Sequence, residues 1–596
     1  MSDSKIQPAV DTHPEVNPSE GRPGHFPALP IREWITYGLL AGALAVTNIY
    51  TTLLTGWGDG GSLIAVVAAV GILSAFRRRA HIQSLNLGQT MASAGGTVGF
   101  AATSYAAVRI AFPSYHADPF MLGVLFFGVG MMGVVLGSAV RKQMIKYYFP
   151  SGTACAVIQK TVTDHSEAAK RPVRLLGIFS AIAGVWSTLS SINFSKVGHA
   201  LLPNLEIASL HGKSLGISAN PVGFGIGIVV GPRIGIGLLM GALAGPVVLG
   251  PLLNSHGIDA THYGDWLRWS AIAVLTLPTF ATLLFAYLFR TPPVVPAGFK
   301  PGVTKYPTPA NMAVVYAVVA VLGTGIAVLA AGSLFDLPWY ETVLVGLLCV
   351  PLCIMNGRVT GDTDINPVRL VIIVILTVFA LALSTTATML LGMTIIATML
   401  AGMAVDMMQD YRTGYLVDAN PVHQTTVQFI GVMVGVLVAV PAILFLDKAM
   451  GFGAGTSLPA PGPTIYATMA KTYAGGAYMT GSLELAIALI SLVGCLYAFL
   501  TAWPRSAQLM PSLFGIGIGM LLDFETCAAI FVGGLIKWIV VKGYTSNAAS
   551  GKKVEAADKA QNDTLLIGSG IFAAAAIIAV IHILISKLTG LYYFYG

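Results

Sequence analysis

Apolar segments long enough to cross a membrane recur along the whole of this 596-residue chain. Only 10% of the residues are charged, whereas 55% are hydrophobic and 67 residues are glycine. Soluble domains carry about 25% charged residues, so a chain of soluble domains is excluded. A membrane span needs about 20 apolar residues, and about fifteen such segments would use half of the chain. The sequence therefore predicts an all-α polytopic membrane protein with 14 to 16 transmembrane helices.

Short basic runs beside the apolar segments predict the topology. The second apolar segment ends at Arg77–Arg79. Two membrane crossings therefore separate these arginines from the N-terminus, which places both on the same side. Positive charge marks the cytoplasmic side, so we expect a cytoplasmic N-terminus. The net charge of +7 comes from such runs, and no basic face with interleaved aromatic residues predicts a nucleic-acid partner. The five cysteines lie in or beside apolar stretches, which argues against a disulfide framework.

A proline-rich stretch near the middle predicts two halves. Residues 290–310 contain six prolines, three basic residues and no acidic residue. We expect a disordered tail (1–34), two transmembrane halves (35–290 and 311–596), a cytoplasmic linker (291–310) and a Gly/Pro-rich insert at 447–480. The sequence FGIGI occurs at 224–228 and again at 514–518, which favours an internal duplication. Whether the repeats are parallel or inverted stays open.

Several helix starts are predicted within or near the membrane. Asn-Pro-Val occurs at Asn220, Asn366 and Asn420, and Asn followed by Pro is typical of a helix N-terminus. The run Pro150-Ser151-Gly152-Thr153 precedes an apolar stretch too short to span, so it predicts a re-entrant half-helix. Helix starts inside a membrane bind anions through unpaired N–H groups. The alternative is that these are ordinary caps where loops meet spans.

One predicted span contains many small polar residues. Residues 83–104 include Gln89, Thr90 and Ser93, which predict either close helix packing or the lining of a transport pathway. The long apolar stretches at 222–252 and 511–541 predict broken helices or pairs of short ones.

Acidic residues in apolar surroundings are candidates for proton coupling. Asp364, Asp406 and Glu525 lie in or beside predicted spans. A charge at the centre of a span costs ~2.5–3.5 kcal/mol, so a carboxyl group at that depth must be neutral, paired or turned inward. The alternative for Glu525 is a loop between two short helices.

Catalytic and cofactor motifs are absent from the sequence. It contains no HExxH, no GxSxG beside a candidate triad and no Walker A motif, and its histidines are scattered. We therefore expect no enzyme activity, no metal site and no cofactor, with an ion gradient as the energy source. A passive channel with Asn-Pro half-helices and a membrane-embedded enzyme are the alternatives.

Five segments resemble the oligopeptide transporter (OPT) family, which includes the yellow-stripe-like metal-chelate transporters. They are FPSGTACAV (149–157), GQTMASAGG (88–96), GDTDINPV (361–368), MQDYRTGYLVDANP (408–421) and LLDFETCAAIFVGGLIKW (521–538). The resemblance implies a proton-coupled importer with about 16 spans, whose substrates are small peptides or metal chelates. Compact members of this length are typical of bacteria, which implies the inner membrane. Val157 and Val422–Gln424 depart from many bacterial members, so peptide and chelate both stay open.

These observations predict a proton symporter for a short peptide or chelate. Ser151, Gly152, Thr153, Asn366, Tyr415 and Asn420, with Gln89, Thr90 and Ser93, are the predicted substrate-binding residues. Glu525 is the first candidate for proton coupling, followed by Asp364 and Asp406. The predicted partners are the substrate, protons and membrane lipid, and a homodimer is left open.

Overall fold

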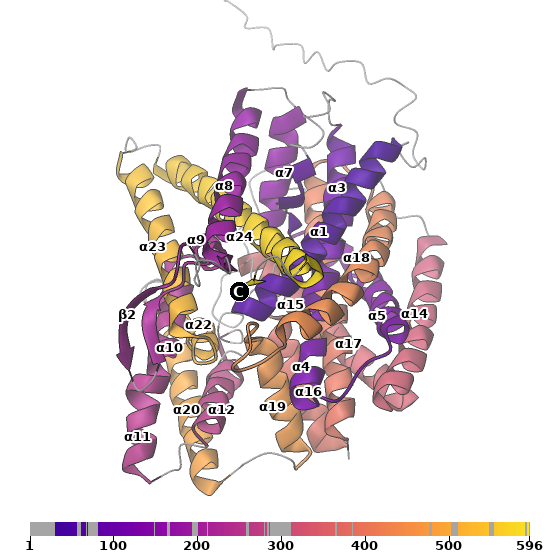
Figure 1. Ribbon diagram of the computed structural model, residues 1–596. Coiled ribbons are helices and arrows are strands. Elements are labelled where there is room, and N and C mark those ends of the chain that lie inside the picture. The colour runs from indigo at the N-terminus through magenta and orange to yellow at the C-terminus, as the bar shows by residue number, and fades with distance from the viewer. Residues whose placement is uncertain are drawn as a thin grey trace, which may run out of the picture.

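The computed structural model describes most of the chain as helix (Figure 1). The described residues are 30–56, 61–62, 64–66, 68–69, 81–147, 149–163, 167–193, 201–210, 213–257, 262–278, 281–282, 285, 311–363, 366–383, 385–475, 480–501, 510–547, 553–589 and 593–594. The predicted linker (291–310), most of the predicted tail (1–34) and Asp364 lie outside these residues.

The helices and strands before residue 300 are α1 (Ile31–Thr55), α3 (Ile82–Ala102), α4 (Tyr105–Ala111), α5 (Pro119–Ala139), α6 (Arg141–Met144), α7 (Pro150–Thr163), α8 (Glu167–Ser191), β1 (Ile192–Asn193), β2 (Leu205–Leu210), β3 (Lys213–Ile217), α9 (Pro221–Val230), α10 (Pro232–Leu243), the π-helix η1 (Ala244–Leu249), α11 (Gly250–Ser255) and α12 (Tyr263–Leu275). Those after residue 310 are α14 (Asn311–Phe335), α15 (Trp339–Thr363), α16 (Val368–Ala382), α17 (Ala387–Leu416), α18 (Pro421–Met450), α19 (Pro461–Tyr473), α20 (Gly481–Leu500), α22 (Leu513–Gly519), α23 (Phe524–Asn547), α24 (Lys553–Thr589) and β4 (Tyr593–Phe594).

Ten helices in the described part of the chain are long and apolar enough to cross a membrane. Three shorter apolar helices, at 174–190, 221–230 and 368–382, add to them. The strands form two short antiparallel pairs, β1 with β4 and β2 with β3. The fold is therefore the predicted all-α polytopic membrane architecture. The apolar stretch at 369–405 forms parts of two helices, because α16 ends at Ala382 and α17 begins at Ala387.

Helices from both sides of residue 300 pack together into one core. Helix α3 packs between α1 and α18, while α17 packs against α3, α5, α15 and α16. Small residues allow the closest of these approaches: Gly95 lies against the backbone of Ala41, and Gly99 lies against that of Ala45. Close backbone contact of this kind drives helix association in a membrane, where burial of apolar surface provides little. A second group contains α8, α9, α10, α22 and α23, and α24 crosses it toward α1 (Figure 1).

Both FGIGI segments lie in the first helix of a broken pair. The predicted segment 222–252 breaks at Gly231, between α9 and α10, where φ is 84°. The segment 511–541 breaks between α22 and α23. Glu525 lies in the first turn of α23, just after that break.

The two broken pairs run in opposite directions. Gly223 packs on Ala529 and Gly227 on Gly533, so α9 and α23 are parallel. Gly231 packs on Gly534 and Gly235 on Phe531, so α10 is antiparallel to α23. Helix α22 runs parallel to α10, because it packs Gly515 on Ile234 and Gly519 on Leu238. The two FGIGI helices, α9 and α22, are therefore antiparallel, which is the relation expected of inverted repeats.

The predicted Asn-Pro helix starts behave differently from one another. Asn220 and Asn420 each cap a helix, since their side chains accept a hydrogen bond from the backbone N–H of Val222 and Val422. Asn366 was expected to cap in the same way and does not. Helix α16 begins at Val368 with Pro367 at the N-cap position, and the Asn366 side chain instead accepts a hydrogen bond from Asn356 at 2.8 Å.

Candidate functional site

A group of buried polar side chains surrounds two aspartates in the middle of the helical core. We call it the α17 cluster, and it consists of Asp406, Asp410, Gln89, Ser93, Gln159, Gln424 and Gln428. The two aspartates lie one helical turn apart on α17, so their side chains share a face of the helix. The other members come from α3, α7 and α18.

Asp410 is completely buried and is hydrogen-bonded by neutral side chains. Ser93 donates to Oδ2 at 2.7 Å, and the Gln89 amide donates to Oδ1. Ser62 lies 3.4 Å from the same Oδ1 atom. Among the described residues, no ion pair involves Asp410. A carboxylate in this position therefore has hydrogen bonds but no cationic partner to balance its charge.

Asp406 receives hydrogen bonds from the neighbouring helices. The Gln428 amide of α18 donates to its Oδ2 atom at 2.8 Å, and Ser93 of α3 lies 3.4 Å from the same oxygen. Ser93 therefore lies between the two aspartates. The three helices α3, α17 and α18 are joined at this point by polar contacts rather than by apolar packing alone.

The cluster contains more buried acceptors than the described donors satisfy. Gln159 donates to Gln89 Oε1 at 3.2 Å, and Gln424 donates to the Asp410 carbonyl at 2.8 Å. The Oε1 atoms of Gln159 and Gln428 are buried and have no hydrogen-bond partner in the described part of the chain. A buried acceptor without a donor costs about 1–3 kcal/mol. One added O–H donor could satisfy one of these two oxygens.

The predicted re-entrant segment lies beside the same part of α17. Helix α7 begins at Pro150, and Gly152 packs against the backbone of Gln409. The Thr413 hydroxyl donates to the Gly152 carbonyl at 2.9 Å. Helix α7 is longer than the short apolar run suggested, and its buried Gln159 reaches the cluster. Ser151 and Thr153 are partly buried in its first turn.

The remaining predicted residues of this region lie at the ends of α17 and α18. Tyr415 is partly buried in the last turn of α17, with the Arg412 guanidinium 6.0 Å from its ring centroid. Asn420 opens α18, which contributes Gln424 and Gln428 to the cluster. Thr90 lies within 3.5 Å of Gln424. Asn366 is exposed and is not in contact with the cluster through any described hydrogen bond.

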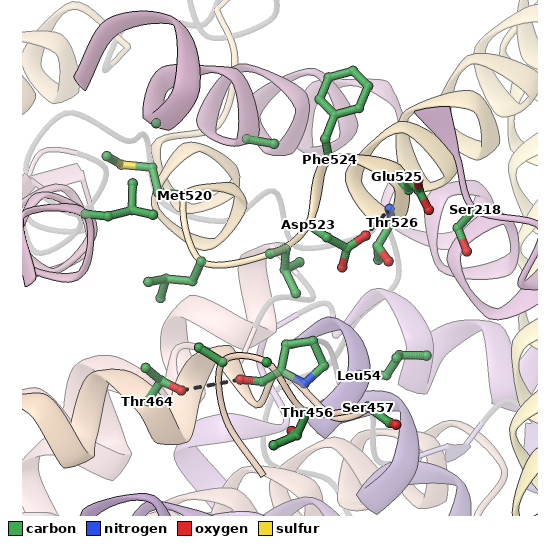
Figure 2. A pocket seen from close by; sticks show the side chains of 18 of the residues that line it. Leu54, Ser218, Thr456, Ser457, Thr464, Met520, Asp523, Phe524, Glu525 and Thr526 are labelled. Carbon is green, nitrogen blue, oxygen red and sulfur yellow. Dashed lines mark hydrogen bonds between the residues drawn. The ribbon is translucent and has the colours of Figure 1, made fainter. Parts of the chain in front are cut away.

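A separate cavity of about 620 Å³ opens at the breaks in the helices. We call it the α9–α23 cavity. Its walls come from the starts of α9 and α23, the ends of α10 and α22, the first turns of α12, the β2–β3 hairpin and the loop before α19. Figure 2 shows Asp523, Glu525 and Ser218 on one wall, with Thr456, Ser457 and Thr464 on the wall opposite. The predicted insert at 447–480 therefore contributes to this cavity through its first part.

The acidic side chains of the cavity lie at a helix start. Glu525 is partly buried and accepts a hydrogen bond from the Asn204 amide at 2.5 Å. Asp523 is exposed and caps α23, since its Oδ2 atom accepts from the Thr526 N–H at 2.7 Å. The Glu525 carbonyl accepts from the Ser218 N–H at 3.1 Å, which ties α23 to the segment before α9. Both carboxyl groups border solvent-accessible space.

The comparison with known proteins identifies the family. The family model of the OPT oligopeptide transporter protein matches residues 28–298 and 299–586. The chain belongs to the OPT family. With ten apolar helices long enough to span in its described part, it is a multi-pass integral membrane protein of a transporter family.

Curated relatives of this OPT protein are distant in sequence. "Probable metal-nicotianamine transporter YSL13" of Oryza sativa subsp. japonica is 24% identical over 70% of this chain and 64% of its own length. "Probable metal-nicotianamine transporter YSL11" of the same plant is 23% identical over 59% of this chain and 56% of its own length. "Putative oligopeptide transporter" of Haemophilus influenzae is 28% identical over 30% of this chain and 28% of its own length. The chain thus spans a little over half the length of the two plant relatives.

Sequence reasoning found part of the cluster in this OPT protein and missed the rest. Gln89, Ser93 and Asp406 were selected, whereas Asp410, Gln159, Gln424 and Gln428 were not. A spacing signal was present: Asp406 and Asp410 are four residues apart, as are Gln424 and Gln428. Residues four apart share a helix face, so two adjacent helices each present a polar pair.

Proposed function

We propose that this OPT-family protein is a proton-coupled secondary transporter of small peptides or peptide-like metal chelates. Two features support the proposal beyond family membership. One is the α17 cluster, which has the chemistry of a proton site, and the other is the α9–α23 cavity, which has the size of a ligand site. The names of the relatives, which include metal-nicotianamine and oligopeptide transporters, support both substrate classes.

The α17 cluster is the observation on which the proton coupling rests. Two carboxyl groups are buried within one helical turn, and the described donors to them are neutral amides and hydroxyls. Asp410 has no ion pair in the described part of the chain, so burial of its charge is costly, and a bound proton removes that cost. A protonated carboxyl also gains an O–H donor, which the buried Gln159 and Gln428 oxygens lack. Binding of one proton therefore improves the charge balance and the hydrogen bonding together.

The α9–α23 cavity supports substrate binding. Its volume of about 620 Å³ lies within the range of about 300–1,000 Å³ found for small-molecule sites. Its walls combine apolar side chains with a few polar ones from broken helices, as in other transporters whose sites lie at such breaks. In this proposal Glu525, the first proton-coupling candidate from the sequence, contributes to the substrate site and becomes the second candidate for proton coupling. Ser151–Thr153, Tyr415 and Asn420 remain predicted binding residues near the cluster.

The energy source and the cellular setting belong to the same proposal. Transport is driven by the proton gradient and requires no cofactor. The chain resides in a bacterial inner membrane with a cytoplasmic N-terminus, so that protons and substrate enter together. Assembly into a homodimer stays a prediction.

Uptake into liposomes tests the proposal. Purified protein is reconstituted, and uptake of labelled tetra-alanine and of an iron–nicotianamine complex is followed with and without an inward proton gradient. We expect at least one of the two to accumulate above equilibrium only when the gradient is imposed. Equilibration that does not respond to the gradient would indicate a channel and contradict coupling. Uptake of neither compound would contradict the proposed substrate classes.

A further inference from the structure

A buried arginine lies beside the wall of the α9–α23 cavity that faces Asp523 and Glu525. Arg369 is the second residue of α16, and its Nη2 donates to the Gly56 carbonyl at the end of α1. The guanidinium carbon lies 5.2 Å from the ring centroid of Phe514. The Tyr466 side chain of α19 also hydrogen-bonds to it. The arginine is thus surrounded by parts of α1, α16, α19 and α22.

Every described partner of Arg369 is electrically neutral. A backbone carbonyl, a phenol and an aromatic ring surround the guanidinium, and no ion pair of this arginine occurs in the part of the chain that the structure describes. The Nη1 atom is buried and has no hydrogen-bond partner there. A guanidinium is always charged, so the site combines an uncompensated positive charge with a free donor. A bound carboxylate would balance the positive charge and would accept paired hydrogen bonds from the guanidinium.

Two helix starts add positive potential at the same place. Neither α16 nor α19 has a side-chain cap at its N-terminus. The Arg369 guanidinium lies next to Gly462 in the first turn of α19. Pro459 and Thr464, on either side of that turn, line the cavity, as does Leu54 near the Gly56 contact. Pro461 and Pro463 have no N–H group, so Gly462 is the residue of this first turn that can offer an unpaired backbone N–H to an anion, beside the arginine.

Arg268 also lines the cavity but is paired with Asp265 at 2.5 Å, so the two facing walls differ in charge. Asp523 and Glu525 lie on one wall, while the start of α19, with Arg369 beside it, forms the wall opposite (Figure 2). We propose that Arg369 and the first turn of α19 bind a carboxylate of the transported solute, and that the Asp523–Glu525 wall receives its cationic end. This inference rests on the proposed transport function and adds an orientation of the ligand to it. It selects solutes with an anionic and a cationic end.

A purely structural role for Arg369 gives different expectations. If the arginine only holds α1, α16 and α19 together, its removal should lower the stability of the empty protein and weaken all ligands equally. If it binds a carboxylate, its removal should weaken only ligands that have one. Replacing an unpaired buried charge by a neutral group should cost the empty protein little.

Ligand binding to the purified protein in detergent tests the inference without requiring transport. Affinities for tetra-alanine and for its C-terminal amide are compared by calorimetry in the wild type, in Arg369→Gln and in Arg369→Lys. Arg171→Gln serves as the matched control, because Arg171 is an exposed arginine paired with Asp563 far from the cavity walls. Melting temperatures of the empty proteins report whether each variant is folded.

We expect the wild type and Arg171→Gln to prefer the free carboxylate over the amide by roughly tenfold to hundredfold, as for a charge-assisted hydrogen bond. Arg369→Gln should bind both compounds equally, and Arg369→Lys should restore part of the preference. A folded Arg369→Gln protein that keeps the preference would overturn the inference. So would a wild type that binds the amide as well as the acid, or that binds neither. Failure of the proposed function would show instead as normal binding without accumulation in liposomes.

Discussion

The α17 cluster and the α9–α23 cavity each contain a pair of carboxyl groups, but in opposite surroundings. Asp406 and Asp410 lie in the middle of a continuous 30-residue helix, buried by three neighbouring helices. Asp523 and Glu525 lie at a helix break and border a cavity of about 620 Å³. The enclosed pair has room for a proton but not for a solute, whereas the open pair has room for both.

This difference suggests a division of labour between the two regions. The closed cluster can exchange a proton through small changes in its hydrogen bonds, because amides and hydroxyls already surround the carboxyl groups. The cavity can accept ligands of several shapes, since its walls come from helix ends and loops. Transport coupling then requires that the two regions move together. Helix α19 packs against α17 and also contributes to the cavity wall, which provides a direct connection.

The largest expected effect comes from Asp410→Asn. The amide has nearly the same shape but cannot bind and release a proton, so accumulation of substrate should stop at equilibrium. Exchange of internal for external substrate should continue, because the cavity is intact. Tracer uptake and counterflow in the same liposomes measure both. If Asp410→Asn still accumulates substrate, the proton site lies elsewhere, and Glu525 becomes the first candidate.

Glu525→Gln should have the next largest effect and should act on binding. The variant lacks a charged partner for the cationic end of the solute. We expect the substrate concentration at half-maximal uptake to rise by roughly tenfold, which corresponds to one charge-assisted hydrogen bond. The accumulation ratio at saturating substrate should be nearly unchanged. The measurement is the concentration dependence of uptake, with N-acetyl tetra-alanine as the control ligand. If the concentration at half-maximal uptake is unchanged and accumulation is lost, Glu525 would act in proton coupling and not in substrate binding.

The fold and part of the site could be predicted because local chemistry decides them. Apolar length and low charge predict the spans, and Asn followed by Pro predicts the capped starts of α9 and α18. The length of the apolar stretches at 222–252 and 511–541 predicted the two broken helix pairs, and their opposite directions became visible only through the packing of Gly227 and Gly515. Asn366 shows the limit, since the same Asn-Pro-Val pattern there leads to a contact with Asn356 instead of a cap.

The rest of the site depends on contacts between distant segments. Asp410 lies in a sequence block that was recognised, but its importance comes from Gln89 of α3 and Ser93, more than 300 residues away. The cavity needs the ends of at least four helices and a loop to exist at all. Arg369 was not selected from the sequence, and only packing shows that its described neighbours are neutral.

Asn420→Ala tests how the start of α18 supports the α17 cluster, and its expected effect is smaller. Loss of the cap should cost about 1 kcal/mol and loosen the start of α18, which holds Gln424 and Gln428 in the cluster. We expect a lower melting temperature and slower proton-driven uptake. Asn254→Ala is the control, because Asn254 is an exposed asparagine near the end of α11 and does not cap a helix start. Equal effects of the two substitutions would contradict this assignment.

The smallest effect is expected from Arg171→Gln. Its ion pair with Asp563 joins α8 to α24 near the surface, with 43% of the arginine side chain exposed. Exposed pairs contribute about 0–1 kcal/mol, so stability and uptake should stay close to wild type. Melting temperature and initial uptake rate measure this. A strong loss of coupling would show that α8 and α24 take part in transport. The α17 cluster and the α9–α23 cavity would then not be sufficient to explain coupling.

Proton movement driven by substrate tests the central claim most directly. A pH-sensitive dye inside the liposomes reports acidification when saturating tetra-alanine or iron–nicotianamine is added outside, without an imposed pH gradient. We predict acidification for the wild type and for Glu525→Gln, and none for Asp410→Asn although that variant still exchanges substrate. Acidification by Asp410→Asn at the wild-type rate would contradict the assignment of the proton to Asp410, and acidification by a variant with both Asp406→Asn and Asp410→Asn would contradict its assignment to the α17 cluster.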